Sequence, residues 1–195
     1  MDPLERVKAY KDTSYFLMLA ADQRGHEVFY LNAVDLALDH DRVMASLQRL
    51  HVNDDVDNPF AVEPARWQAL DEMDVVWIRT DPPVDRSYIY ATLLLDLLPK
   101  RVRVVNRPST IRDWNEKLAA LRYPDWTPRT IVSRDSGRIR TFTEKFSRVT
   151  IKPIDGHGGS GIFFVTAADS DFDSTINEAT RQGRHWVIVQ EYLEA

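Results

Sequence analysis

The segment that most constrains this chain is 149–165, where four of its seven glycines stand together. Short apolar, β-prone runs flank these glycines on both sides. Glycines placed so densely let backbone N–H groups turn toward one point, and without Cβ atoms they approach an anion closely. Lys152 adds a positive charge just before them. The segment is therefore expected to be a hairpin whose glycine turn binds nucleotide phosphates.

The order of Lys152 and the glycines distinguishes this segment from two common phosphate motifs. A Walker loop carries its lysine after the glycines and opens a helix, and a dinucleotide fingerprint also continues into a helix. Here the lysine comes first, and the glycines precede strand-forming residues. A flap over phosphates suits phosphoryl transfer, in which the protein supplies position and charge. The alternative is an ordinary glycine-rich hairpin, because such turns occur in many proteins.

The composition is that of a globular protein. With 195 residues, of which 44% are hydrophobic, the chain can bury a core in one large or two modest domains. The net charge is -5, and the most basic stretch, 101–107, alternates with valines, so no nucleic-acid partner is expected. The sequence has no long apolar run, signal peptide or cysteine, which favours a cytoplasmic location and no membrane partner.

Helix and strand signals alternate along the first part of the chain, which is typical of an α/β fold with a parallel sheet. Residues 53–64, rich in Asp, Asn and Pro, are expected to form a loop, and 74–78 a buried strand. Three further helices are expected: one capped by Asp12–Ser14 that stops at Gly25, one over 88–98, and one from Ser109 or Thr110 to Leu121. Strands are expected over 28–31 and 102–105, and a hairpin over 36–52 that turns at 39–41.

A proline-containing link, 123–128, is the expected boundary between two domains, 1–122 and 123–195. The second part is expected to be a small α+β unit. Its strands are predicted over 130–133, 149–153, 162–165 and 186–190, and its helices over 139–146 and 173–182.

Four blocks of the sequence together resemble prokaryotic glutathione synthetase, a branch of the ATP-grasp superfamily. They are Met1–Pro3 with Lys11–Ser14, Arg79–Pro83 with Tyr88–Thr92, Val105–Ser109 with Arg112–Leu118, and Ile151–Gly159. Other ATP-grasp enzymes share the last block, whereas the order of the first three is similar to this branch alone. The resemblance covers nearly the whole chain. It implies an α/β fold with an N-terminal pre-ATP-grasp parallel-sheet domain followed by an incomplete ATP-grasp domain.

The family joins γ-glutamylcysteine to glycine, using ATP and Mg²⁺, through an acyl-phosphate. The resemblance implies that the nucleotide is held by Lys117 and Lys152 on the phosphates, by the flap residues Gly156, Gly158, Gly159, Ser160 and Gly161, and by Gln190, Glu191, Tyr192 and Leu193 at the adenine. Without the resemblance, a lysine such as Lys117 on an amphipathic helix is more often a solvated charge than a ligand, and Tyr192 could be a core aromatic.

Substrate contacts are expected after the strand at 74–78. Arg79 and Asp81 stand at its carboxyl end, where open α/β sheets bind ligands, although Asp81 could instead fix the loop. Tyr88 and Tyr90 lie two positions apart on a predicted helix, so at most one of them faces a ligand. Tyr90 is taken as the third substrate candidate.

The resemblance also implies parts that this sequence lacks. The family opens with a hydrophobic strand before Asp-Pro, whereas Asp2 here follows Met1, and the family's magnesium ligands lie beyond residue 195. The chain is therefore expected to be truncated at both ends and inert alone, because metal must neutralise charge during phosphoryl transfer. No catalytic residue is assigned, and the complete protein is expected to be a homo-oligomer. The alternatives are another ATP-grasp carboxylate–amine ligase and a non-catalytic nucleotide-binding remnant.

Overall fold

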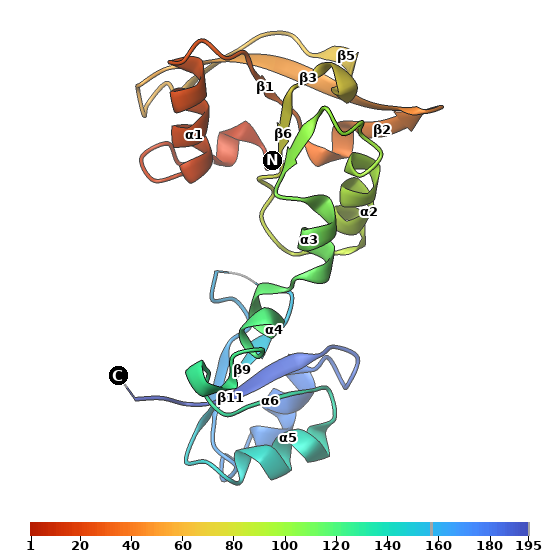
Figure 1. Cartoon of the computed structure of the whole chain (residues 1–195). Coiled ribbons are helices and arrows are strands. Elements are labelled where there is room, and N and C mark those ends of the chain that lie inside the picture. Colours follow the sequence, from red (N-terminus) through yellow and green to blue (C-terminus); the bar gives the residue numbers. More distant parts are fainter. Residues whose placement is uncertain (157, 195) are drawn as a thin grey trace. The chain divides into compact units, whose positions relative to one another are not determined.

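The computed structural model describes residues 1–156 and 158–194. His157, which lies inside the glycine loop of the sequence, falls outside the described residues. The chain forms two compact units, Met1–Asp113 and Trp114–Ala195 (Figure 1). The boundary after residue 122 that the proline-containing link suggests stays a prediction. No helix within the described residues has both the length and the apolar character needed to cross a membrane.

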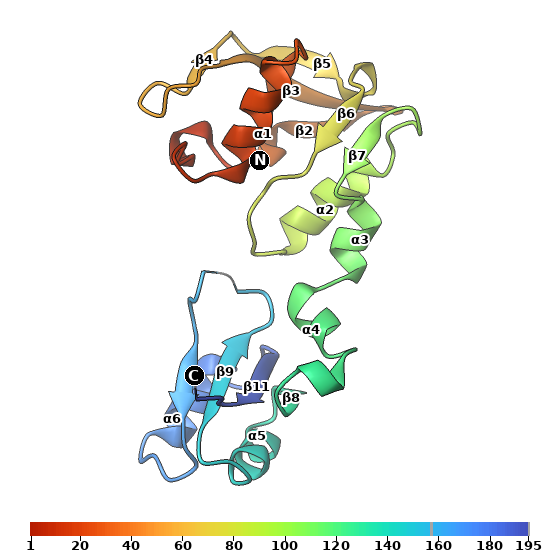
Figure 2. The ribbon, with the colours of Figure 1, turned by 60° about the vertical axis from the view of Figure 1, so that its left-hand side comes forward.

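The first unit is built around one long strand, β3 (Arg42–Val52), which pairs antiparallel with four shorter strands (Figure 2). These are β1 (Val28–Tyr30), β2 (Leu36–Asp39), β4 (Phe60–Val62) and β5 (Arg66–Ala69). The turn between β2 and β3 contains His40 at φ 55°, so the hairpin predicted over 36–52 is confirmed.

Strand β3 buries opposite faces in its two halves. Val43, Ala45 and Leu47 belong to one core, whereas Leu50 and Val52 belong to another. Because side chains alternate along a strand, Leu47 and Leu50 point to opposite sides of the sheet. The first core includes residues of the helix α2 (Arg86–Leu95), and the second includes residues of α1 (Thr13–Asp22). This change of face explains why the alternation along the sequence of β3 is imperfect.

Parallel pairing in the first unit is limited to two strands, β6 (Val75–Trp77) and β7 (Arg103–Val105). The mixed α/β class is confirmed, but the larger sheet is antiparallel rather than parallel. The strand expected to be buried at 74–78 exposes Val75 and Trp77, and only Val76 of β6 is buried. Those two side chains lie on the side of the strand that does not join the core.

Two further elements differ from the sequence-based expectation. The loop expected over 53–64 contains β4, which forms because its three residues pair with β3. The helix expected to run to Leu121 is broken into α3 (Pro108–Asp113) and α4 (Glu116–Ala120), because the side chain of Asn115 caps a new helix. Short 3-10 turns occur at Leu4–Arg6, Ala33–Asp35, Leu70–Glu72 and Pro124–Trp126.

The second unit is a four-stranded antiparallel sheet with two helices on one face (Figure 1). The strand order is β10 (Phe163–Val165), β9 (Val149–Pro153), β11 (Val187–Glu191), β8 (Thr130–Ser133). The helices α5 (Ser136–Thr143) and α6 (Phe172–Ala179) supply Ile139, Phe172 and Ile176 to the core. The predicted small α+β unit is thus confirmed.

Candidate nucleotide-binding site

The sheet face turned away from α5 and α6 carries the polar side chains of the second unit. Val149 and Ile151 of β9 join the core with the helices. Since side chains alternate along a strand, Lys152 points to the other face. Gln190 pairs with Thr150 on one side and with Thr130 on the other. Lys152 and Gln190, which are both predicted to bind the nucleotide, therefore lie on the same face of the sheet.

Lys152 is held in place on this face by a chain of hydrogen bonds. Its Nζ donates to Oε1 of Gln190 at 3.0 Å, and Nε2 of Gln190 donates to Oγ1 of Thr130 at 3.1 Å. The three residues lie on three neighbouring strands, β9, β11 and β8. The arrangement places a positive charge near the end of β9, immediately before the glycine loop. The sequence predicted Lys152 and Gln190 but not the contribution of Thr130.

The glycine loop joins β9 to β10 in an antiparallel hairpin, as the sequence predicts. Gly158, Gly159 and Gly161 have φ values of +60°, +78° and +69°, a region that side-chain-bearing residues rarely adopt. A Cβ atom at Gly156 would lie 2.5 Å from Cγ of Pro153. The loop backbone therefore depends on glycine. Ser160, the other predicted flap residue, is exposed within it.

Lys117 lies beside the start of the glycine loop. Its Nζ donates to the carbonyl oxygens of Gly156 and, at 3.4 Å, Ile154. Asn115 supports this position in two ways. Its Oδ1 accepts from the backbone N–H groups of Lys117 and Leu118, which caps α4, and its Nδ2 donates to the Ile154 carbonyl at 3.3 Å. Asn115 lies within the motif Arg112–Leu118, but the sequence did not predict a role for it.

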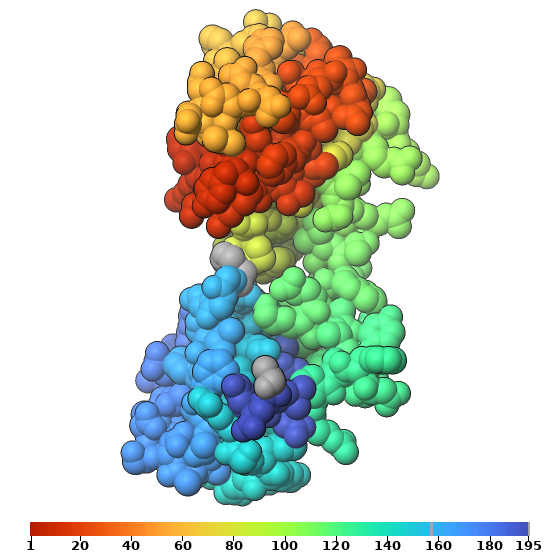
Figure 3. Space-filling view, turned by 90° about the vertical axis from the view of Figure 1, so that its left-hand side faces the viewer, coloured from red at the N-terminus to blue at the C-terminus, as the bar shows by residue number. Residues whose placement is uncertain are grey.

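The last residue of β11 and the residue after it are held by backbone hydrogen bonds. The N–H of Glu191 donates to the carbonyl of Arg129 at 2.9 Å, and the N–H of Tyr192 donates to the carbonyl of Arg148 at 3.0 Å. Leu193 is 62% exposed. In the space-filling view, the dark-blue end of the chain lies at the surface of the second unit (Figure 3). Glu191 and Tyr192 are therefore tied to neighbouring segments, and the chain becomes exposed at Leu193.

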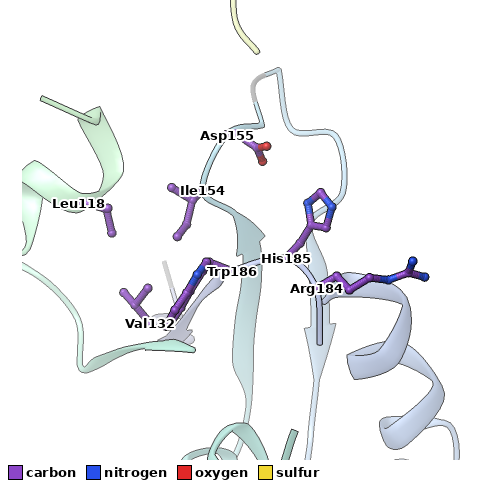
Figure 4. A pocket seen from close by; sticks show the side chains of 7 residues that line it. All are labelled: Leu118, Val132, Ile154, Asp155, Arg184, His185 and Trp186. Carbon is purple, nitrogen blue, oxygen red and sulfur yellow. The ribbon is translucent and has the colours of Figure 1, made fainter. Parts of the chain in front are cut away.

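A pocket of about 480 Å³ opens on the same sheet face, at the end away from Tyr192. Figure 4 shows the apolar side chains of Leu118, Val132, Ile154 and Trp186 around one space, with Arg184 and His185 extending to one side. Ile154 also provides the carbonyl that Lys117 contacts. The sequence did not predict this pocket, because its lining comes from four separate segments.

The substrate candidates lie in the first unit and do not form one cluster. Nε of Arg79 donates to Oγ of Ser14 at 3.0 Å, and the backbone N–H of Asp81 donates to Oδ2 of Asp2 at 2.9 Å. Asp81 lines a pocket of about 450 Å³ together with Tyr88. Tyr90 is 58% exposed and is not among the residues that line this pocket.

Tyr88 rather than Tyr90 faces the interior of this pocket. Its hydroxyl donates to the carbonyl of Thr80 at 3.2 Å. Burial raises the pKa of the Tyr88 hydroxyl, and the nearby carboxylates of Asp2 and Asp81 raise this pKa further. The hydroxyl is therefore a neutral hydrogen-bonding group near pH 7.

Acidic side chains do not gather into a metal site in the described part of the chain. Within residues 1–156 and 158–194, no three His, Asp or Glu side chains are grouped so that they could hold a metal ion. The described residues thus show no grouping of carboxylates that could hold magnesium.

Two family models together match nearly the whole chain. Residues 1–112 match the prokaryotic glutathione synthetase N-terminal domain, and residues 116–195 match the prokaryotic glutathione synthetase ATP-grasp domain. The chain belongs to the prokaryotic glutathione synthetase family. The resemblance noted in the sequence motifs is confirmed at the level of the family.

Individual members of the prokaryotic glutathione synthetase family align over the whole chain. Glutathione synthetase from Shewanella oneidensis is 37% identical over 99% of this chain, and glutathione synthetase from Gloeobacter violaceus is 40% identical over 100% of it. Each alignment covers 62% of the relative. The chain thus spans less than two thirds of the length of these glutathione synthetases.

Solved structures support the ATP-grasp fold of this family member. A RimK domain ATP-grasp protein from Sphaerobacter thermophilus superposes with a TM-score of 0.59 at 23% identity, covering 100% of this chain and 63% of that one. D-alanyl-alanine synthetase A from Vibrio cholerae gives a TM-score of 0.53 at 12% identity, covering 93% of this chain and 54% of that one. At these identities the likeness concerns the fold alone.

Proposed function

We propose that the second unit binds ATP on the sheet face that carries Lys152. The observation that supports this most directly is the position of two lysines at the glycine loop. Lys152 lies one residue before the end of the strand that leads into the loop, and Lys117 of α4 contacts the carbonyl oxygen of Gly156. Two cations beside a glycine-rich turn can neutralise a polyphosphate, while freed backbone N–H groups bind its oxygens.

Each predicted nucleotide residue has a role in this proposal. Lys117 and Lys152 contact the phosphates, and the loop residues Gly156, Gly158, Gly159, Ser160 and Gly161 close over them. The adenine is contacted by the backbone of four residues and by the apolar side chain of Leu193. The four residues are Gln190, Glu191, Tyr192 and Leu193. Lys117 exchanges its loop carbonyl partners for phosphate oxygens when the nucleotide enters, because a charged acceptor forms the stronger hydrogen bond.

We place this ATP site in glutathione biosynthesis. The reaction is the ligation of γ-glutamylcysteine to glycine: ATP transfers its terminal phosphoryl group to the peptide carboxylate, and the glycine amine then displaces phosphate from the acyl-phosphate. Membership of the prokaryotic glutathione synthetase family supports this reaction. A cysteine-free chain suits the reducing cytoplasm, where we expect the reaction to occur.

The first unit is proposed to contact the peptide substrate. The pocket that contains Asp81 and Tyr88 offers carboxylate and hydroxyl groups to a polar ligand, among them the neutral hydroxyl of Tyr88. Arg79 uses its Nε–H on Ser14, and the terminal nitrogens of its guanidinium are proposed to contact a substrate carboxylate. Tyr90 remains a candidate because an exposed aromatic side chain is free to meet a ligand from outside the pocket.

Magnesium is the cofactor expected with ATP in this reaction. The described residues do not gather carboxylates for it. They are therefore assigned the binding and orientation of the nucleotide, and none of them is assigned a step that involves the metal.

Release of ADP tests the proposed reaction. The assay contains ATP, magnesium, γ-glutamylcysteine and glycine. It compares the 195-residue chain with a full-length relative in which this chain replaces the matching region. We expect the chimaera to release ADP only when both γ-glutamylcysteine and glycine are present. Turnover with a different carboxylate and amine, but not with this pair, would favour another ATP-grasp ligase.

A further inference from the structure

Arg148 lies against two aromatic rings beside the segment that follows β11. Its guanidinium carbon is 4.8 Å from the ring centroid of Tyr192 and 5.2 Å from that of Phe164. The two rings meet edge to face, with centroids 5.8 Å apart and an interplanar angle of 88°. Arg148 immediately precedes β9, Phe164 lies in β10, and Tyr192 immediately follows β11.

This aromatic cluster, Arg148 with Phe164 and Tyr192, lies on the same sheet face as Lys152. Phe164 pairs with Thr150, and Thr150 pairs with Gln190, whose side chain contacts Lys152. Residues paired directly across neighbouring strands point to the same face. The aromatic cluster therefore borders the proposed nucleotide site at the end where the adenine is expected.

The guanidinium of Arg148 lies over these rings, and its positive charge also helps to lower the pKa of the Asp169 carboxylate. The ion pairs found among the described residues do not include Arg148. A guanidinium over a ring face is attracted by the negative quadrupole of the ring, and the planar group stacks well. Phe164 is 51% exposed, so the cluster is not held merely by burial in the core.

Backbone and side chain act on the same residue. The carbonyl of Arg148 accepts the N–H of Tyr192, while the guanidinium of Arg148 covers the Tyr192 ring. Tyr192 is thus fixed at two points by a single residue of the neighbouring strand. Tyr192 is the first residue beyond β11, so these contacts hold the chain at the point where it leaves the sheet.

From this geometry we infer that Arg148 is a positioning residue for the base of the nucleotide, acting through Tyr192 on the backbone of residues 191–193. The inference rests on the proposed ATP site and adds to it a residue that the sequence motifs did not indicate. Arg148 lies at the end of β9 opposite the glycine loop, so no contact with the phosphates is assigned to it. Replacing Arg148 should therefore weaken the binding of the adenine and leave the binding of the phosphates unchanged.

Two measurements on the 195-residue chain test this role. The first is hydrogen exchange of the 191–193 amides without nucleotide, in wild type, Arg148→Ala, Arg148→Lys and the control Arg138→Ala, an exposed arginine on α5. We expect faster exchange in Arg148→Ala, partial protection in Arg148→Lys and no change in the control. Unchanged exchange in Arg148→Ala would overturn the positioning role.

The second measurement compares the affinities for ATP and for tripolyphosphate, which lacks the base. Arg148→Ala should weaken ATP binding roughly fivefold, the loss expected from two exposed cation–π contacts, and leave tripolyphosphate binding unchanged. Equal losses for both ligands, or no loss for ATP, would contradict a role at the base. If wild type binds neither ligand, the proposed ATP site itself fails, whereas the exchange result still decides whether Arg148 orders the segment.

Discussion

Lys152 and Gln190 form a hydrogen bond between neighbouring strands, with 3.0 Å between Nζ and Oε1. The acceptor is a neutral amide. The ion pairs among the described residues do not include Lys152, so no carboxylate there cancels its charge. An oriented cation with a neutral partner remains available to an anionic ligand. This relationship is the basis of the proposed nucleotide site.

Asn115 should contribute to stability and to nucleotide binding through different atoms. Asn115→Ala removes both the cap of α4 and the bond to the Ile154 carbonyl, so it should lower the free energy of unfolding by about 1 kcal/mol. Asn115→Asp keeps the capping acceptor but loses the amide donor. We expect it to retain most of the stability while ATP affinity falls. Urea denaturation and calorimetric titration measure the two effects. Equal stability losses in both variants would contradict this separation.

The glycine loop should need positive φ for binding as well as for folding. Gly161→Ala and Gly25→Ala place a side chain at φ +69° and +78°, each at a cost of about 1 kcal/mol or slightly more. Gly25 lies in the first unit, in the turn after α1, and serves as the matched control. Both variants should melt at lower temperature, but only Gly161→Ala should weaken ATP binding. A comparable loss of affinity in Gly25→Ala would show that the effect is not local.

Asp169 should make the second unit sensitive to acid. Its carboxylate accepts the backbone N–H and the hydroxyl of Thr166, both at 2.7 Å, and these bonds hold its pKa below the usual range. A lowered pKa in the folded state stabilises the fold above the unfolded pKa of about 3.9. This stabilisation is lost as pH falls through the lower folded value.

Melting curves of Asp169→Asn at several pH values test this dependence. The variant should melt below wild type near neutral pH, and the difference should shrink as pH falls below about 4. Glu178→Gln, at an exposed position of α6, is the control and should show no such change. A difference between wild type and Asp169→Asn that is the same at every pH would contradict the role of the ionised carboxylate.

Local sequence patterns predicted the elements of the second unit well, because those elements rest on short-range signals. The strand before the glycines and the strand after them have clear apolar runs, and the turn between them consists of residues that favour turns. The break at Asn115 escaped prediction, since the residues around it also suit a continuous helix. The helix ends there because Asn115 turns its side chain back to cap the next one.

Contacts between distant segments limited what the sequence could predict. β4 has only three residues in a polar stretch and becomes a strand by pairing with β3. At the candidate site, the motifs indicated Lys117 and Lys152 but neither Thr130 nor Arg148, whose roles depend on register across the sheet. One sequence signal could have indicated Arg148: it immediately precedes a predicted strand and stands four residues before Lys152, with Thr150 between them. Because side chains alternate along a strand, this spacing places Arg148 on the same face as Lys152.

Calorimetric titration of ATP into the 195-residue chain can show whether Lys152 binds the nucleotide phosphates, when wild type, Lys152→Met and Lys145→Met are compared. Lys145 is an exposed lysine beyond the end of α5 and serves as the control. We predict that wild type and Lys145→Met bind ATP equally. Lys152→Met should bind it at least roughly tenfold more weakly at an unchanged melting temperature, as expected for a lost charge-assisted contact. Equal ATP affinity in all three proteins would contradict the assignment of Lys152 to the nucleotide phosphates.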